Sequence, residues 1–367
     1  MHTPQIDDQL DFTSDAFLRN PWPTYRLLRR TAPVSWSERS SAFFVSKHED
    51  VTAALAGKQF VSGFPLRASR RLFGRTGVDS DGPDHREFRK LFAPIFGPGA
   101  VRRLQSEILV PAVDDALHEA SSFLGARTWP SADVIDCLAV RVPYGVITRL
   151  MGCPVDDAAW LRSHIVPLSG AIEFPSASLE AALIAKSELT AYLGRLISDR
   201  GRADGPLSIL DVAVPRDSPA DLAQVGRAIL FFAAGTETSV TAIRHIFRAL
   251  HEHDVDLGSL VDDALRRRVI RETLRWDPPS HTVVRYAATD LSLRGVQIPR
   301  RSAVLLSLAS ANRDDEVYAD PDVWWPNRTE SRTLSFSAGS HSCIGMALAL
   351  AEFDLLFQRL ARLFLRA

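Results

Sequence analysis

The chain has 367 residues, of which 46% are hydrophobic and 24% charged, and its formal net charge at pH 7 is −1. This near-neutral balance argues against a nucleic-acid-binding protein, which would carry an excess of basic residues. The three cysteines, Cys137, Cys153 and Cys343, are too few and too oddly numbered for a disulfide framework, and they suit a reducing cytoplasm.

The amino-terminal residues 1–19 are polar and contain no apolar core of a signal peptide. The most apolar internal run, residues 228–235, is far shorter than the ~20 residues that a membrane helix needs. We therefore expect a cytoplasmic protein that uses no membrane. No linker, repeat or low-complexity tract divides the chain, which favours a single domain over residues 1–367.

In chain order, the first predicted elements are a proline-started helix over residues 20–28 and a hairpin with strands near 34–36 and 42–45. Residues 60–81 show no periodicity and predict a long loop, which in compact domains is often functional. Helical patterns then begin at Asp84, Val101, Ser131, Ser178 and Asp221. Alternating β-branched residues between 279 and 308 predict strands. The result is a mainly α protein with a small sheet at each end of the sequence.

One predicted helix, over about residues 221–250, is interrupted by Gly235-Thr236-Glu237-Thr238. Glycine in a helix costs ~1 kcal/mol relative to alanine, and threonine is stiff. This predicts a local opening of the hydrogen-bond ladder, beside which Glu237 and Thr238 offer a carboxylate and a hydroxyl for proton transfer. The alternative is that the threonine only bonds back to the carbonyl four residues earlier.

Near the carboxyl end, residues 336–345 read Phe-Ser-Ala-Gly-Ser-His-Ser-Cys-Ile-Gly and run directly into an apolar helical stretch from Met346. Backbone N–H groups and the positive end of the helix would stabilise a thiolate at Cys343. A thiolate is one of the few axial ligands that a protein offers to haem iron. A structural cysteine is one alternative. A hydrolase nucleophile elbow is another, weakened because His341 occupies its first glycine position.

This loop resembles the cysteine-ligand loop of the cytochrome P450 superfamily, whose pattern in many soluble bacterial members is Phe-Gly-x-Gly-x-His-x-Cys-x-Gly. The matching residues are Phe336, Gly339, His341, Cys343 and Gly345. Ser337 departs, because the family usually has glycine there. The resemblance extends from about Pro21 to the last residue, with separate matches in the family's order. It implies a helix-rich α+β fold with small sheets.

The resemblance implies haem b, iron protoporphyrin IX, as the cofactor, with Cys343 as the thiolate ligand. Ala234 would contact the haem from the interrupted helix, where the opening leaves room for O₂ and a water. The haem propionates need cations, and the residues that resemble the family's propionate ligands are His85, Arg89, Arg285 and His341. His85 and Arg89 share one helical face, and Arg285 lies in an apolar strand where an unpaired charge is costly. For each of these residues, a surface salt bridge is the alternative.

Glu272-Thr273-Leu274-Arg275 corresponds to the family's Glu-x-x-Arg, and Glu and Arg three apart lie on one helical face. In the resembling family the pair is buried and is joined by an arginine from a later loop, for which Arg328 is the candidate. The expected role is structural.

Substrate contacts are expected from residues 61–79, 164–187 and 279–284 and from the interrupted helix. The apolar residues expected to line the pocket are Phe64, Phe73, Ile172, Phe174, Phe231 and Val284. His281 either orients a substrate group or points away from it. The arginines of the long loop, Arg67, Arg70, Arg71 and Arg75, form a solvated face or attract a carboxylated or carrier-bound substrate.

The chain contains no Gly-x-Gly-x-x-Gly fingerprint and no cysteine set for an iron–sulfur cluster, so it needs an external electron donor. The family implies a ferredoxin or a flavodoxin with an NAD(P)H-dependent reductase. The basic residues that could form the docking patch are Arg86, Lys90, Arg102 and Arg103.

The sequence therefore favours a haem-thiolate monooxygenase that hydroxylates an apolar small molecule, in bacterial secondary metabolism as the family suggests. Oxidative coupling or peroxide-driven oxidation on the same scaffold is the first alternative. The second is a haem protein without turnover, because the chain stops at Ala367 where soluble relatives continue through a terminal β-hairpin.

Overall fold

The computed structural model describes residues 12, 14–65, 67–120, 129–173, 179–199, 207–214, 221–330 and 332–366. The chain divides into two compact units, each built from two stretches of sequence. The first unit comprises residues 1–64 and 271–343, and the second comprises residues 65–270 and 344–367. The prediction of a single domain over the whole chain stays a prediction.

The first unit combines a mixed sheet with short helices. Its elements are α1 (Asp15–Arg19), α2 (Trp22–Thr31), β1 (Val34–Ser37), β2 (Ala42–Val45), α3 (His48–Ala56), β3 (Phe60–Val61), β4 (Thr282–Ala287), β5 (Leu291–Leu293), β6 (Val296–Ile298), β7 (Ala303–Ser307), α15 (Leu308–Ala311) and the 3₁₀ turn η5 (Gly339–His341). Helix α14 (Asp263–Trp276) ends in this unit. The predicted proline-started helix and the predicted hairpin are confirmed as α2 and as β1 with β2.

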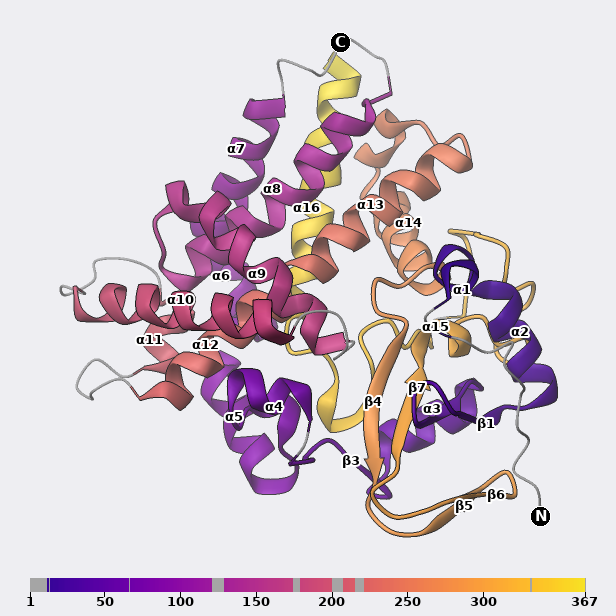
Figure 1. Ribbon diagram of the computed structural model, residues 1–367. Helices are drawn as coiled ribbons and strands as arrows, with labels where there is room; N and C mark the ends of the chain where they lie inside the picture. The colour runs from indigo at the N-terminus through magenta and orange to yellow at the C-terminus, as the bar shows by residue number, and fades with distance from the viewer. Residues whose placement is uncertain are drawn as a thin grey trace. The chain divides into compact units, whose positions relative to one another are not determined.

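The five-stranded sheet of this unit has the order β1-β2-β7-β4-β3, and β4 and β7 lie side by side in Figure 1. The expectation of a separate sheet at each end of the sequence is wrong, because β2 pairs in parallel with β7 and so joins both ends in one sheet. Aliphatic side chains explain the pairing. Val45 and Leu306 lie in register and are both fully buried, so pairing the strands removes both from water.

The second unit is helical. Its elements are α4 (Ala68–Phe73), η1 (Gly77–Asp79), α5 (Gly82–Phe96), α6 (Pro98–Leu104), the π-helical turn η2 (Gln105–Leu109), α7 (Val110–Ala120), α8 (Ala132–Met151), η3 (Val155–Asp157), α9 (Ala158–Glu173), α10 (Leu179–Ser198), α11 (Ile209–Ala213), α12 (Leu222–Gly235), α13 (Glu237–Glu252), η4 (Leu257–Val261) and α16 (Met346–Arg366). Two predicted helix starts are confirmed by their caps. Ser131 accepts from the Val134 N–H, and Asp221 forms a capping box with Gln224.

The prediction of an unstructured loop over residues 60–81 is wrong in part, because the segment contains β3, α4 and η1. Within the second unit, polar contacts between α4 and η1 hold this short helix. Arg67 Nη1 donates to the Val78 carbonyl at 2.8 Å, and the Ser69 hydroxyl donates to Asp79 at 2.6 Å. These contacts hold the segment in place, although its sequence shows no helical periodicity.

The mainly α fold class with small sheets is confirmed by these elements. Among the helices that the structure describes, none combines the length and the apolar character needed to cross a membrane.

Candidate active site

In the first unit, Cys343 lies at the end of a tightly folded loop, and its side chain is exposed. The Cys343 N–H donates to the Phe336 carbonyl at 2.8 Å, and the Ser337 N–H donates to the Leu334 carbonyl at 2.7 Å. Helix α16 begins three residues after the cysteine, at Met346. The backbone therefore fixes the position of the thiol while leaving it accessible to a ligand.

Two residues with positive φ shape this loop. Gly339 has φ +70°, and a Cβ atom there would lie 2.3 Å from the Leu55 carbonyl oxygen of α3, so only glycine fits. Ser337 has φ +59°, which a side chain disfavours. Its hydroxyl oxygen is buried and forms no hydrogen bond with any residue that the structure describes. Ser337 therefore lies under backbone strain at the position where the resembling family has glycine.

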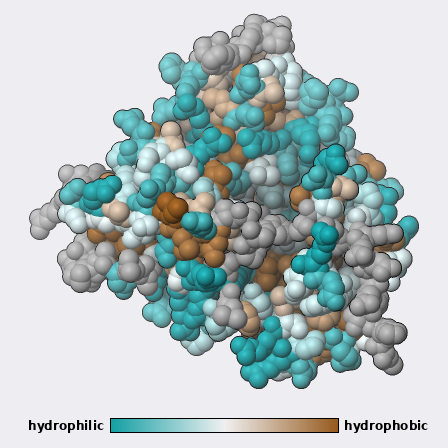
Figure 2. Space-filling model, in the orientation of Figure 1, coloured by the Kyte–Doolittle hydropathy of each residue, from teal (hydrophilic) through white to brown (hydrophobic). Residues whose placement is uncertain are grey.

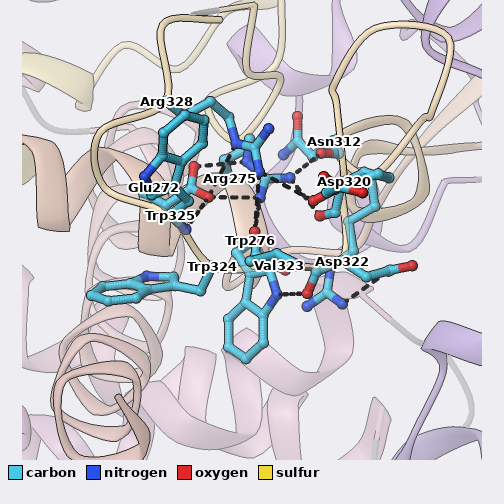
Figure 3. Close-up of polar contacts among 12 residues, drawn as sticks. Glu272, Arg275, Trp276, Asn312, Asp320, Asp322, Val323, Trp324, Trp325 and Arg328 are labelled. Atoms are coloured by element: carbon cyan, nitrogen blue, oxygen red, sulfur yellow. Dashed lines mark hydrogen bonds and ion pairs between the residues drawn. The ribbon is translucent and has the colours of Figure 1, made fainter. Parts of the chain in front are cut away.

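Glu272 and Arg275 of α14 form a buried, bidentate ion pair, which Figure 3 shows with its surroundings. Arg275 Nε and Nη2 each donate to a different Glu272 oxygen at 2.8 Å, and Arg328 Nε donates to Glu272 Oε1 at 3.3 Å. The Trp325 N–H also donates to Oε1, at 2.9 Å. The structure thus brings together the three residues that the sequence suggested. The buried carboxylate accepts hydrogen bonds on both oxygens.

The two arginines also hold backbone carbonyls of the later loop (Figure 3). Arg275 donates to the carbonyls of Asn312, Pro321 and Val323, and Arg328 donates to those of Ala319, Asp320 and Val323. Because most of these carbonyls belong to residues 319–323, the cluster fixes the path of that segment. This geometry supports a structural role within the first unit.

Arg285 and His341 are the candidate propionate ligands of the first unit. Arg285 lies on β4, is only 6% exposed, and donates from Nη1 to the Val284 carbonyl at 2.9 Å. His341 is half-buried, lies in η5 and precedes Cys343 by two residues. A buried cation and a histidine near the thiol are suitable partners for acid groups.

The candidate substrate residues of this unit contact other protein residues. His281 Nδ1 lies 3.1 Å from the Tyr25 hydroxyl, and its Nε2 lies 3.8 Å from Asp277. Phe64 stacks on Tyr286 with ring centroids 4.0 Å apart, while Val284 of β4 is half-buried. These partners explain the position of His281 without a ligand, so both alternatives for this residue stay open.

In the second unit, the long helix is interrupted where the sequence predicts it. Helix α12 ends at Gly235, Thr236 has φ −98° and ψ −65°, and α13 starts at Glu237. The two residues before the interruption, Ala234 and Gly235, are exposed, although the preceding residues 225–233 are nearly all buried. Small exposed residues at this point leave an open surface against which a flat ligand can lie.

Hydroxyl groups donate to three successive carbonyls at this break. Thr236 donates to the Phe232 carbonyl at 2.8 Å, and Thr238 donates to that of Ala234 at 2.9 Å. The carbonyl between them, on Ala233, accepts from Ser169 of α9 at 2.7 Å. The back-bonding expected as the alternative for Thr238 is therefore present. It stabilises the break without removing the lone pairs with which the hydroxyl can accept a proton donor.

Glu237 is held by a tyrosine that the sequence did not suggest. The Tyr144 hydroxyl of α8 donates to Glu237 Oε1 at 2.6 Å, and Tyr144 is 2% exposed, whereas Glu237 is half-buried. Burial, and then the hydrogen bond to Glu237, raise the pKa of Tyr144 far above its ordinary value. The phenol therefore stays protonated and acts as a hydrogen-bond donor.

The other candidates of the second unit lie on α4, α5 and α12. His85 is buried, and its Nδ1–H donates to the Gly77 carbonyl at 2.8 Å, which directs Nε2 away from that carbonyl. Arg89 follows one turn later and is half-buried. Phe231 packs among the rings of Phe92 and Phe96, with centroids 4.5 and 4.9 Å away.

Phe73 is buried, and its carbonyl oxygen would lie 2.4 Å from a Cβ atom on Gly226, so α4 and α12 make a close backbone contact. Phe174 lies outside the described residues, whereas Ile172 is half-buried on α9. The basic residues proposed for docking, Arg86, Lys90, Arg102 and Arg103, are all exposed.

Comparison with known proteins identifies the family. Over 352 residues, the chain is 31% identical to the cytochrome P450 monooxygenase PikC of Streptomyces venezuelae, which covers 92% of this chain and 82% of PikC. The chain belongs to the cytochrome P450 family. The family model for cytochrome P450 matches residues 264–365, and the chain is 27% identical over 351 residues to cytochrome P450 109 of Bacillus spizizenii, covering 91% of this chain and 82% of that protein.

Solved cytochrome P450 structures have the same fold. P450BioI in complex with an acyl carrier protein carrying hexadec-9Z-enoic acid is 25% identical, with a TM-score of 0.84 over 95% of this chain and 92% of that one. Ligand-free CYP164A2 of Mycobacterium smegmatis is 29% identical, with a TM-score of 0.80 over 94% and 90% of the two chains. The predicted family and fold are thereby confirmed.

Cytochromes P450 are monooxygenase-type oxidoreductases that bind haem through a cysteine thiolate, so haem is the cofactor of this chain. The described residues fit it. In the first unit an exposed thiol is fixed by backbone hydrogen bonds, and in the second unit small residues are exposed at a helix break. Sequence reasoning missed Tyr144 and Ser169, because nothing in the local pattern of α8 or α9 marks a residue that meets α12 or α13.

Proposed function

We propose that this cytochrome P450 hydroxylates an apolar small molecule and that Cys343 is the axial haem ligand. The observation that carries the proposal is the Cys343 loop, which presents an exposed thiol. The Cys343 N–H donates to the Phe336 carbonyl, and Gly339 closely approaches Leu55, so the backbone of the loop is fixed. When bound, haem supplies the iron that activates O₂ for insertion of one oxygen atom into the substrate.

Glu237 and Thr238 are proposed to hold and move protons at the helix break. Glu237 offers a carboxylate at the first position of α13. Thr238 can pass on a proton because its hydroxyl both donates and accepts, and its present donation to Ala234 fixes its orientation. Positioned groups of this kind accelerate proton transfer by roughly 10²–10⁴-fold.

Cations are proposed to pair with the haem propionates. The candidates are Arg285 and His341 in the first unit and His85 and Arg89 in the second. For His85, the hydrogen bond to Gly77 sets the ring orientation, so that Nε2 is the nitrogen that can meet an acid group. Charge-assisted hydrogen bonds to carboxylates are about twice as strong as neutral ones.

An apolar substrate is supported by the surface of α9 and α10, two adjacent helices of the second unit. Apolar side chains gather over these helices in Figure 2. On the helices themselves, Val166, Leu183 and Ile184 are 44%, 42% and 56% exposed. Surface patches of this kind often mark binding sites. The pocket roles of Phe64, Phe73, Phe231 and Val284, and of Phe174 outside the described residues, stay predictions, and both alternatives for His281 stay open.

A carrier-bound substrate is the second candidate, because the similar P450BioI was solved with a loaded acyl carrier protein. Arg71 is exposed and suits an acidic carrier. However, Arg67 pairs with Asp79 and Arg75 pairs with Asp84 within the second unit, which leaves less of the arginine face for a partner. We therefore place a free small molecule first.

Electrons are proposed to come from a ferredoxin or a flavodoxin with an NAD(P)H-dependent reductase. The exposed side chains of Arg86, Lys90, Arg102 and Arg103 on α5 and α6 are compatible with docking of an acidic donor. Such electron-transfer contacts are typically small and short-lived.

The test is the absorption spectrum of the reduced protein under carbon monoxide. A thiolate ligand shifts the Soret band strongly to the red, and Cys343→Ser is expected to abolish that shift. Cys137→Ser is the matched control, because Cys137 is a half-buried thiol on α8 of the second unit, and this variant should keep the wild-type band.

Retention of the red-shifted band in Cys343→Ser, or its absence in the wild type, would overturn the assignment of Cys343. Turnover with a donor system and O₂, measured beside turnover with peroxide alone, separates a monooxygenase from a peroxide-driven enzyme. Haem binding without either activity would indicate a non-catalytic haem protein.

A further inference from the structure

We propose that Tyr144 is a positioning residue for Glu237: it fixes one carboxylate oxygen so that the other is directed to proton transfer. The inference rests on the proposed role of Glu237 in proton delivery. Tyr144 lies on α8 and acts through the glutamate, with no direct role toward substrate or haem.

The contact is short and comes from a rigid group. The Tyr144 hydroxyl donates to Glu237 Oε1 at 2.6 Å, within the range of hydrogen bonds to charged oxygens. Tyr144 is 2% exposed on α8, which packs against α13, so its ring has little freedom to move. Glu237 is half-buried and begins α13 directly after the break at Thr236. A flexible side chain at an irregular helix junction is thus held from a regular, buried helix.

The same contact leaves the glutamate able to carry a proton. Only Oε1 accepts the bond from Tyr144, and a carboxylate has two oxygens with about four acceptor positions. The raised pKa of Tyr144 keeps the phenol protonated, so the tyrosine does not compete for the proton that Glu237 transfers. Tyr144 therefore orients the carboxylate without taking part in the transfer.

The helix break is also held from α9, where Ser169 donates to the Ala233 carbonyl. Without the Tyr144 hydroxyl, the backbone at the break would keep this support, whereas the Glu237 carboxylate would lose its donor and the Thr236 hydroxyl would lose a neighbour. Tyr144→Phe should therefore change the orientation of Glu237 more than the fold. This separation makes the role testable.

The second unit offers a matched control. Tyr192 of α10 donates to Asp157 Oδ2 at 2.6 Å, so Tyr192→Phe removes a tyrosine–carboxylate bond of equal length away from the break. A purely structural effect of losing such a bond would appear in both variants.

The experiment compares wild type, Tyr144→Phe, Tyr192→Phe, Glu237→Gln and the double variant Tyr144→Phe with Glu237→Gln as haem-loaded proteins. Infrared difference spectra against Glu237→Gln identify the Glu237 carboxylate band in the resting protein. We expect this band to shift in Tyr144→Phe and to stay in place in Tyr192→Phe. This readout needs no turnover.

The activity arm measures product formed per NAD(P)H consumed and the solvent deuterium isotope effect. Tyr144→Phe should lower the product yield roughly tenfold, as expected for losing one hydrogen bond to a charged group, and should raise the isotope effect. The KM for substrate should hardly change. In the Glu237→Gln background, Tyr144→Phe should have almost no further effect, because the group it positions is gone.

An unshifted Glu237 band with normal product yield in Tyr144→Phe would overturn the proposal, as would an equal loss in Tyr192→Phe. If Tyr144→Phe does not fold, the tyrosine doublet in the Raman spectrum of Glu237→Ala decides, because alanine cannot accept the bond and an unchanged doublet then means that Tyr144 does not donate to Glu237. A wild-type protein without the red-shifted carbon monoxide band would overturn the proposed function instead, and the infrared band would still test the contact.

Discussion

Among the residues that the structure describes, two glutamates are almost completely buried, one in each unit, and their surroundings differ. Glu272 in the first unit is 4% exposed, and its two oxygens accept hydrogen bonds from Arg275, Arg328 and the Trp325 N–H. Glu352 on α16 in the second unit is 3% exposed, and its Oε1 forms no hydrogen bond within the described ranges. Burial raises the pKa of Glu352 to about 8.

The comparison shows that the partners of a buried carboxylate, more than its burial, decide its effect on stability. A buried carboxylate that accepts several charge-assisted hydrogen bonds helps to stabilise the folded unit. A buried carboxyl with an oxygen that no described residue bonds instead favours its neutral form, and the unit is destabilised at any pH where the carboxyl would ionise in the unfolded chain. The same substitution, glutamate to glutamine, should therefore have opposite effects at the two positions.

The largest effect is expected from Glu272→Gln. It removes one charge from a buried cluster. Arg275 loses its counter-charge and Arg328 keeps only the more distant Glu330, 3.8 Å away, which should lower the free energy of unfolding by about 3–5 kcal/mol. Guanidinium unfolding followed by tryptophan fluorescence measures this. Glu49→Gln is the control, because Glu49 is 81% exposed in its pair with Arg294 and should change stability by less than about 0.5 kcal/mol. Similar values for the two variants would contradict the structural role of the cluster.

A smaller effect of opposite sign is expected from Glu352→Gln. Because folding raises the pKa of Glu352 from 4.5 to about 8, the native state keeps a proton that the unfolded chain releases. The penalty is absent below pH 4.5, grows as the pH rises, and stops growing above about 8. Glutamine has no proton to lose, so this variant should be more stable than wild type by on the order of 1–3 kcal/mol at pH 7 and equal to it at pH 4.

Unfolding curves at several pH values test this second prediction. The gain of Glu352→Gln must increase with pH between the two pKa values. A gain that is independent of pH, or a loss of stability at pH 7, would show that the carboxylate has a partner in solution and is not isolated.

The smallest effect concerns the loop before Cys343. Ser337→Gly should raise the free energy of unfolding by about 1 kcal/mol, because it relieves a positive φ and removes a buried hydroxyl that forms no hydrogen bond to the residues described. Ser340→Gly is the control, since Ser340 is exposed in the same loop and is not among the residues with positive φ, so glycine there should give no gain. Equal stability of Ser337→Gly and wild type would indicate that the serine is compensated elsewhere in the loop.

Much of the candidate site could be predicted because its motifs are local. Glu272 and Arg275 are one helical turn apart, and Gly235 and Thr236 weaken a helix at the place where it breaks. The pairing of the strands was harder to predict. Both β2 and β7 are short and apolar, and such runs do not indicate which strand lies beside them. The short helix α4 was missed because its contacts with Val78 and Asp79 come from the following turn.

The sequence by itself determined the family, the order of most helices and the residues offered for haem and proton chemistry, because spacing along a helix or loop fixes these neighbours. Only the tertiary structure decided that Tyr144 holds Glu237, that Gly339 must approach Leu55, and that Glu352 is buried with an oxygen that forms no hydrogen bond to the described residues. Each of these facts depends on an atom brought close by packing. The bond between Tyr144 and Glu237 joins residues 93 positions apart, so no local sequence pattern could predict it.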